Sequence, residues 1–336
     1  MKKKCLMVLL LFTMTAALIC ACGSETEPRN GLQQTPDAGN GGNDVSEEDP
    51  EELLSETEKK TTDMLDPDGA CGENVFWKLE NGTLTISGTG PMYDYEYYVE
   101  GKNSPWRDDD TETAQVKEVV IEQGVTRIGN CSFFRHKNLI RVTIPDSVTE
   151  IGIGAFQACE TLPEIAIPAS VIKIEKEAFG ACGLECITFS DGLTGIGEQA
   201  FRGTKLVSVI LPDSVTEVGM SAFGMCRQLE EVKLSAQMTI IPDEMFQECE
   251  ALAGVTIPEG VTSIGNNAFE RCYMLEYIAI PKSVTSIGRY AVNGAGGAVG
   301  GAEIRYAGSE ADWAAIEISG DNLGLDEKPL QFNGSN

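Results

Sequence analysis

Histidine is almost absent from this chain of 336 residues, which contains a single one, His136, and only 3 tryptophans. One histidine leaves little material for a serine–histidine–aspartate relay or a histidine-rich metal site, and no nucleophile motif accompanies it. Positive charge is also scarce, because 25 Lys and Arg face 52 Asp and Glu, for a net charge of −27. Such a surface repels nucleic-acid phosphates and anionic lipid headgroups. The composition therefore excludes a nucleic-acid partner and favours basic or neutral ones.

Long hydrophobic segments are lacking too, apart from one near the N-terminus. Lys2, Lys3 and Lys4 precede an apolar run of about 14 residues that ends at Ile19, too short for a comfortable membrane span. The segment Ile19-Cys20-Ala21-Cys22-Gly23 resembles a bacterial lipobox, in which the cysteine after a small residue is lipidated. We expect residues 1–22 to be a lipoprotein signal peptide with the lipid on Cys22, since bulky Ile19 disfavours Cys20. A conventional secretory signal is the alternative.

This leader predicts where the chain resides. We expect it to be exported and anchored to the outer face of the bacterial cell membrane, which it would contact only through the lipid on Cys22. Residues 23–70 are rich in Glu, Asp, Gly, Asn, Thr and Pro, with few large apolar residues. Such a composition buries too little surface to offset its ordering entropy, so we predict a disordered acidic tether.

Beyond the tether the sequence repeats with a period of 22 or 23 residues, starting at Val125, Val148, Val171, Leu193, Val215, Met238, Val261 and Val284. A phenylalanine recurs at one position of the repeat: Phe133, Phe156, Phe179, Phe201, Phe223, Phe246 and Phe269. A cysteine often follows three residues later: Cys159, Cys182, Cys226, Cys249 and Cys272. Each unit then continues with a pattern such as Leu139-x-x-Val142-x-Ile144-Pro145.

The period predicts a stack of short structural units. The alternating apolar residues of the pattern indicate a short strand, which Pro ends because it has no N–H to donate. The chain is then expected to turn through Val-Thr-x-Ile-Gly, and a short helical turn would carry Ala-Phe inward. One unit cannot bury its apolar residues alone, whereas stacked units bury them continuously, with the phenylalanines as a structural spine.

The repeated pattern Ile-Pro-x-Ser-Val-Thr-x-Ile-Gly-x-x-Ala-Phe-x-x-Cys-x-x-Leu resembles the BspA-like leucine-rich repeats of bacterial surface proteins. Residues 71–115 resemble the N-terminal module that often precedes such repeats, through the segment 82–90 and Pro105-Trp106, and 304–309 resembles a closing segment of the same proteins. The resemblance implies a leucine-rich-repeat solenoid, α/β horseshoe-like and strand-rich with short helical turns, capped at both ends. Its expected parts are an N-terminal capping module (71–115), the repeats (116–293), and a Gly-rich connection with a C-terminal cap (294–336).

No residue is predicted to be catalytic or to bind a cofactor or a metal. The five recurring cysteines are expected to be buried thiols acting as small apolar side chains, with one or more disulfides as the alternative. His136 is interpreted as a partly exposed side chain that replaces a core cysteine. The Gly-rich stretch 294–300 lacks the βαβ context of a dinucleotide site, and Asp108-Asp109-Asp110 with Glu112 lacks the ligand spacing of a dedicated calcium loop.

The resemblance implies surface display and binding, and it leaves the partner open. Solenoid strands expose alternate residues along their inner, concave side, so we expect a partner-binding surface there. The candidate residues are Arg141, Thr143, Glu164, Ser208, Glu231, Lys233 and Tyr277. The predicted function is protein–protein interaction or adhesion, with extracellular or envelope proteins as partners. Binding of glycans or small solutes is the alternative, and an enzyme is disfavoured.

Overall fold

A computed structural model describes residues 69–97, 99–107, 116–297, 301–322, 325 and 330–332. Contacts between Cα atoms divide the chain into units Met1–Met64 and Leu65–Asn336, and all described residues belong to the second. The predicted leader with Cys22, the tether up to residue 68 and the segment Asp108–Glu112 lie outside the described residues. Among the helices of the described part, none has the length and apolar character needed to span a bilayer.

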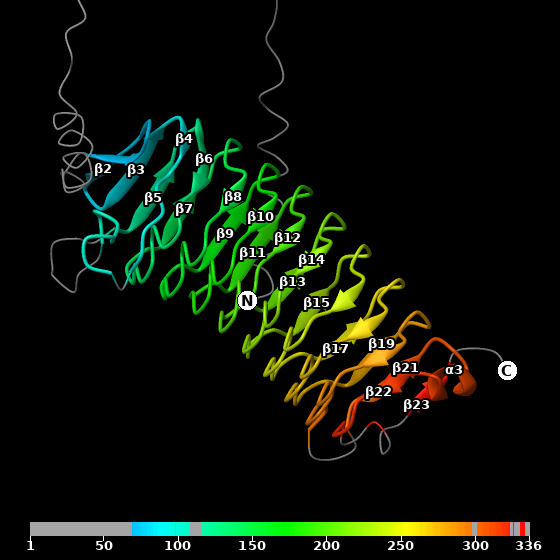
Figure 1. Cartoon of the computed structure of the whole chain (residues 1–336). Coiled ribbons are helices and arrows are strands. Elements are labelled where there is room, and N and C mark those ends of the chain that lie inside the picture. Colours follow the sequence, from blue (N-terminus) through cyan, green and yellow to red (C-terminus); the bar gives the residue numbers. More distant parts are fainter. Residues whose placement is uncertain are drawn as a thin grey trace, which may run out of the picture. The chain divides into compact units, whose positions relative to one another are not determined.

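The described unit is a parallel-strand solenoid of about 9 turns, as Figure 1 shows. Each repeat contributes one strand to a first column, formed by the repeated aliphatic pattern, and the terminal caps add β3 (Thr83–Gly88), β21 (Glu303–Tyr306) and β23 (Leu330–Phe332). The strands of the repeats are β5 (Glu118–Ile121), β7 (Arg141–Thr143), β9 (Glu164–Ile167), β11 (Cys186–Phe189), β13 (Ser208–Ile210), β15 (Glu231–Lys233), β17 (Gly254–Thr256) and β19 (Tyr277–Ile280). The hairpin partners β1 (Ala70–Gly72) and β2 (Val75–Glu80) extend the column with antiparallel pairs at its N-terminal end.

A second parallel column lies where the sequence predicted a turn, so that part of the prediction was wrong. Its strands are β4 (Gly90–Pro91), β6 (Val125–Ile128), β8 (Glu150–Ile151), β10 (Lys173–Ile174), β12 (Gly195–Ile196), β14 (Glu217–Val218), β16 (Ile240–Ile241), β18 (Ser263–Ile264), β20 (Ser286–Ile287) and β22 (Glu317–Ile318). Stacking makes this segment extended, because each turn donates to the one before: the Gly152 N–H lies 3.0 Å from the Ile128 carbonyl oxygen.

The predicted helical turn beside each phenylalanine was wrong as well, since no helix occurs in residues 116–297. In every repeat the residues two before and two after the spine position have positive φ, such as Glu177 (56°) and Ala181 (53°) around Phe179. Two left-handed residues within five positions break a right-handed helix. The backbone instead bonds to the next turn, with the Phe179 N–H 2.8 Å from the Ala200 carbonyl oxygen. The described helix in the C-terminal cap is α3 (Glu310–Ala314).

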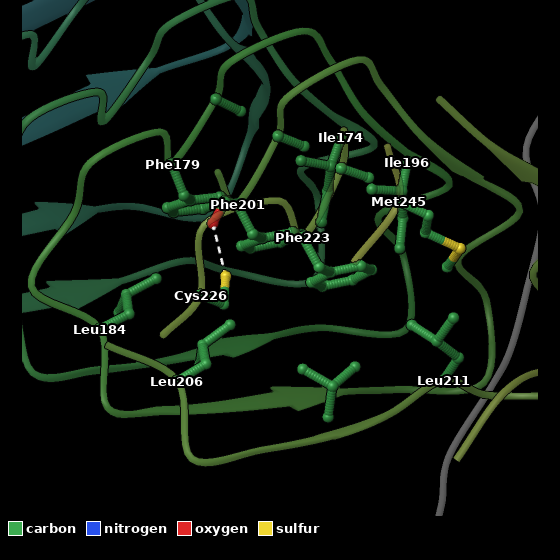
Figure 2. Close-up of a cluster of buried hydrophobic side chains, with 14 of the residues drawn as sticks. Ile174, Phe179, Leu184, Ile196, Phe201, Leu206, Leu211, Phe223, Cys226 and Met245 are labelled. Atoms are coloured by element: carbon green, nitrogen blue, oxygen red, sulfur yellow. Dashed lines mark hydrogen bonds between the residues drawn. The ribbon is translucent and has the colours of Figure 1, made fainter. Parts of the chain in front are cut away.

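The seven phenylalanines form a continuous stack through the core. Each is 0% exposed, and the ring centroids of neighbours lie 5.0–6.0 Å apart. Figure 2 shows Phe179, Phe201 and Phe223 with aliphatic side chains on either side. Trp106 extends the stack at its N-terminal end, 5.9 Å from Phe133, and Val292 occupies the same position in the last repeat. The stack is the common core onto which every turn adds its own apolar residues.

The repeated cysteines bond to this stack. Each Sγ donates to the carbonyl oxygen of the phenylalanine one turn earlier, at 3.1 Å from Cys159 to Phe133 and 3.2 Å from Cys226 to Phe201 (Figure 2). The sequence suggested only a small apolar role, whereas the structure adds a hydrogen bond to a buried carbonyl. All five are free thiols in the described part of the chain. Burial raises the pKa of the Cys226 thiol to about 11 and that of Cys249 well above its ordinary value.

Within the described turns the strand ladders are interrupted between β7 and β9, between β11 and β13, and between β14 and β16. Prolines explain two of these gaps. At the position of Pro163 other turns donate an N–H backwards, as Ala253 does to the Glu230 carbonyl oxygen (3.1 Å). At the position of Pro242 the following turn has Gly265, which also donates backwards. Proline has no N–H, so the ladder stops at these steps.

The stack predicts a large loss of stability from removing one central ring. We expect Phe201→Ala to lower the free energy of unfolding by about 3–5 kcal/mol, because it deletes two stacking contacts and leaves a cavity between turns. Phe76→Ala is the matched control, since that ring is 50% exposed. Denaturant unfolding followed by circular dichroism measures both. Equal losses in the two variants would contradict the role of the stack.

The raised thiol pKa values predict low reactivity and a loss of stability at high pH. The Cys226 thiol is protonated when folded and ionises more easily when unfolded, so its contribution is full below pH 9.0 and lost as pH rises through about 11. Unfolding should therefore become easier across this range, and less steeply so in Cys226→Ala. Iodoacetamide at pH 8 should label Cys226 and Cys249 only after denaturation. Mass spectrometry showing rapid labelling of the native chain would disprove the prediction.

Candidate interaction surface

The seven candidate partner-binding residues all lie on the strands of the first column, at positions that alternate with residues packed in or against the core. Thr143, Glu164, Glu231 and Lys233 are exposed, while Ser208 and Tyr277 are half-buried. Arg141 has 71% of its side chain exposed and forms an ion pair with Glu118 at 3.3 Å. We call this outward side of β5 to β19 the variable face, because the residue at each register position changes from turn to turn.

Register brings part of the set together. Ser208 pairs with Glu231, and Ile210 pairs with Lys233 on the neighbouring strands β13 and β15. Tyr277 lies two strands further along, opposite Gly254. Glu164 on β9 is separated from this group by β11 and the interruption after it, and Arg141 and Thr143 on β7 lie beyond the interruption between β7 and β9 as well. The candidates therefore form two clusters on one face.

The Tyr277 ring contacts an arginine side chain, which the sequence did not reveal. The Arg305 guanidinium lies 4.1 Å from the ring centroid, and its Nε is 2.6 Å from Glu303 Oε2. A Cβ on Gly254 would come within 2.3 Å of Tyr277 Cε1, so the ring lies across the bare backbone of that glycine. Arg305 belongs to the strand after the last repeat, outside the repeat pattern. Only the stacking of β21 on β19 brings the two side chains together.

A pocket of about 390 Å³ opens at the edge of the variable face. Lys233 is the only candidate residue in its lining, which otherwise comes from the ends of β11 and β13 and the residues that follow them. The full lining is Phe189, Asp191, Ile210, Leu211, Pro212, Asp213, Ser214 and Lys233. Sequence reasoning missed this pocket. The available signal was the spacing, because the two successive steps from Val171 to Val215 are 22 residues and their neighbours are 23.

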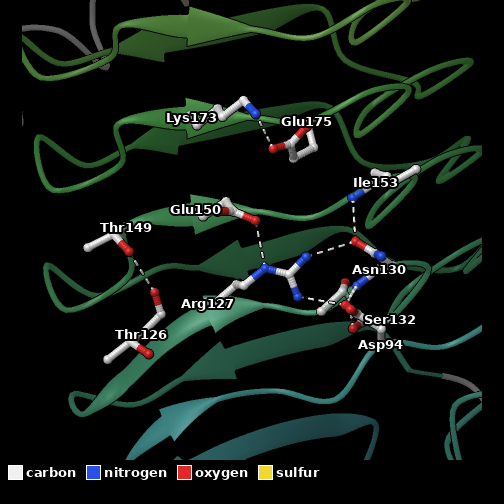
Figure 3. A network of polar contacts seen from close by, with 11 residues as sticks. Asp94, Thr126, Arg127, Asn130, Ser132, Thr149, Glu150, Ile153, Lys173 and Glu175 are labelled. Carbon is white, nitrogen blue, oxygen red and sulfur yellow. Dashed lines mark hydrogen bonds and ion pairs between the residues drawn. The ribbon is translucent and has the colours of Figure 1, made fainter.

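The outward side of the second column is of a different kind, because its side chains mainly hold the turns together. A threonine recurs there: Thr126, Thr149, Thr194, Thr216, Thr239, Thr262 and Thr285. Thr149 Oγ1 donates to the Thr126 carbonyl oxygen at 3.1 Å, and most later members of the series repeat this bond (Figure 3). Hydroxyls engaged in this way stabilise the stack and are less available to a partner.

Arg127 connects the N-terminal module to the first repeats on the same side. Its Nη1 lies 2.6 Å from Asp94 Oδ1, its Nε lies 2.6 Å from Glu150 Oε1, and Nη2 donates to Asn130 Oδ1 at 2.9 Å (Figure 3). Only about a quarter of the Arg127 side chain is exposed. Three acceptors around one half-buried guanidinium indicate a structural joint.

His136 is buried, so the expectation of a partly exposed side chain was wrong. It is 1% exposed, with Nε2 3.1 Å from the Trp106 carbonyl oxygen and Nδ1 3.3 Å from the Phe134 carbonyl oxygen. Trp106 in turn donates from Nε1 to the Ser132 carbonyl oxygen at 2.8 Å. The bonds between Trp106 and His136 or Ser132 join the N-terminal module to the first repeat. Capping explains why histidine stands where other turns carry cysteine.

Among the described residues, no group of three or more His, Cys, Asp or Glu side chains is arranged to hold a metal ion. The Gly-rich stretch follows the last repeat, and Gly294, Gly296 and Gly297 have positive φ. A Cβ on Gly296 would meet the Ala302 nitrogen at 2.1 Å, so a close backbone approach requires glycine there.

Comparison with known proteins agrees with this architecture. The family model described as BspA type leucine rich repeat region matches residues 111–183 and 172–296, in six copies. A leucine-rich repeat protein from Bacteroides ovatus is similar in structure, with 23% identity, a TM-score of 0.56, and coverage of 78% of this chain and 70% of that one. Its similarity concerns the fold alone. Among curated proteins the comparison finds no match.

Two further solved structures are similar over much of their length. A leucine rich cell surface protein from Faecalibacterium prausnitzii has 22% identity and a TM-score of 0.37, over 75% of this chain and 98% of that one. A leucine-rich repeat protein of T. pallidum has 29% identity and a TM-score of 0.47, over 61% and 89%. The family model itself spans more than half of the 336 residues. The chain therefore belongs to the BspA-type leucine-rich-repeat family.

Proposed function

We propose that this chain is a cell-surface lipoprotein whose variable face binds other proteins, either host or neighbouring-cell proteins in adhesion or components of the envelope. One observation carries the proposal. The outward side of the second column carries a recurring threonine that bonds between turns, whereas on the variable face no residue recurs in this way and several side chains are exposed. A solenoid of this kind is a scaffold for binding, and residues that do not hold the scaffold together are those available for recognition.

The charge and chemistry of the face favour proteins over glycans. Arg141, Glu231 and Lys233 give it charges of both signs, as at the polar rims of protein interfaces. Tyr277 is the aromatic residue in the candidate set, and Arg305 already stacks on its ring. Sugar recognition usually uses open aromatic faces, and the Tyr277 ring is already covered on one side. The test below distinguishes protein binding from glycan binding.

Replacing the anchors of the variable face should weaken partner binding. We expect the combination Arg141→Glu, Glu231→Lys, Lys233→Glu and Tyr277→Ala to weaken binding at least about tenfold, because charged and aromatic anchors dominate interface energetics. The full chain is immobilised and exposed to mucosal, matrix and bacterial-surface extracts, and retained proteins are identified by mass spectrometry. A glycan array runs beside it.

The matched control reverses charges on the other column, with Lys173→Glu and Glu217→Lys on β10 and β14. It should retain every specific partner of the unmodified chain. If a partner still binds the first combination of substitutions and no longer binds the control variant, the binding site lies on the second column. A glycan signal without protein partners would replace the proposal by carbohydrate binding.

The proposed anchor has its own test. We expect Cys22→Ser to move the chain from the membrane fraction to the medium or periplasm, because a serine cannot carry the thioether-linked lipid. Cys20→Ser is the control and should stay in the membrane fraction. Immunoblots of fractionated cells, with radiolabelled palmitate to detect the lipid, measure both. Labelling that persists in Cys22→Ser and disappears in Cys20→Ser would assign the lipid to the other cysteine.

A further inference from the structure

A serine that lines the pocket lacks a hydrogen-bond partner. At the same position of other turns the hydroxyl is engaged: Ser147 and Ser283 donate from Oγ to the carbonyl oxygen of the preceding turn's valine, at 2.7 and 2.8 Å. Ser170 and Ser214 are buried at Oγ and bond to nothing in the described structure. These two serines follow β9 and β13, the strands that come directly after the two interruptions of the first column. The exceptions therefore coincide with places where a turn has separated from the one before it.

The separation at β13 falls between two shortened repeats. The repeats that contain β11 and β13 each lack one residue between the spine and the strand, as their 22-residue spacing shows. Between these strands the structure retains one backbone bond, from the Val207 N–H to the Glu185 carbonyl oxygen at 3.3 Å. Gly192 is packed against the turn on the other side, since a Cβ there would lie 1.9 Å from the Ala169 carbonyl oxygen. Gly192 thus holds the corner after β11 against the preceding turn.

The pocket combines an apolar wall with two carboxylates. Ile210, 63% exposed, and Phe189 belong to the wall, and Asp191 and Asp213 are exposed at the corner. Asp213 Oδ1 accepts from the Ala236 N–H at 3.1 Å, which orients that carboxylate. In the described part of the chain neither Asp forms an ion pair with a Lys or Arg. A volume of 390 Å³ is near the lower end of the range for ligand pockets, about 300–1,000 Å³.

We propose that this pocket binds an arginine or lysine side chain of a protein partner. The inference rests on the proposed function and identifies the partner's chemistry. An apolar stem would lie along Ile210 and Phe189, and its cationic head would meet Asp191 and Asp213. The net charge of −27 draws basic partners towards the surface as well.

Lys233 fixes the orientation of the bound side chain. It lines the pocket from β15, on the strand side, whereas both carboxylates lie on the corner side. A cationic head therefore goes to the corner and away from the Lys233 ammonium group. Removing this like charge in Lys233→Met should strengthen the binding of a single basic side chain. The direction of this effect separates a pocket for cations from one for carboxylates.

The test titrates the full chain, labelled at isoleucine δ1-methyl groups, with N-acetyl-arginine amide. Ile210 reports on the pocket, and its signal is assigned with Ile210→Val. We expect a saturable shift of this signal with N-acetyl-arginine amide and none with the citrulline analogue, which has the same shape without the charge. Asp191→Asn with Asp213→Asn should weaken binding at least about tenfold.

The control is Asp146→Asn with Glu259→Gln, which removes two negative charges from equivalent exposed corners outside the pocket. It should bind like the unmodified chain. Equal shifts with citrulline, equal weakening in the control, or weaker binding in Lys233→Met would each overturn the proposal. The proposed function fails separately: a protein partner unaffected by Asp191→Asn with Asp213→Asn refutes the pocket alone, and probe binding without any protein partner refutes only the proposed function.

Discussion

The structure depends on one constraint: no turn can satisfy its own backbone or bury its own side chains without the next. The backbone of each repeat bonds to its neighbours on three sides, through two strand columns and through the segment around the phenylalanine. The spine and the cysteine thiols that donate to its carbonyls repeat with the same step. Left-handed residues, which cost about 1–2 kcal/mol each, persist at two positions of every repeat because neighbouring turns hold them there.

The same constraint makes the solenoid sensitive to small changes of sequence. A proline at a donor position removes one bond between turns, and another interruption falls between two shortened repeats. Both events leave the spine intact, since Phe179, Phe201 and Phe223 stay 5.3 Å apart through the shortened repeats. The core therefore tolerates irregularities that open the surface. The pocket beside β13 is such an opening, and its unpartnered serine marks it.

The outward sides of the two strand columns differ because one of them carries most of the side chains that connect successive turns. Threonines and the Arg127 network occupy the outward side of the second column and connect successive turns. The variable face carries fewer connections of this kind, so its residues differ without destabilising the stack. A partner would be recognised by these variable residues. The two clusters of candidate residues and the pocket lie on this same face.

Sequence alone determined the period, the strand of each repeat, the Phe spine and the membership of the family, because stacking of identical units imposes identical residues at identical positions. It also indicated which residues of the first column point outward, since side chains alternate along a strand. Sequence did not reveal the second column or the left-handed pairs, because bonds between turns override local turn and helix preferences. His136 and the Tyr277–Arg305 contact join residues from different repeats or from a cap. Only the tertiary structure decided these contacts and the pocket between the two short turns. Each of them depends on distances between turns, which no single repeat encodes.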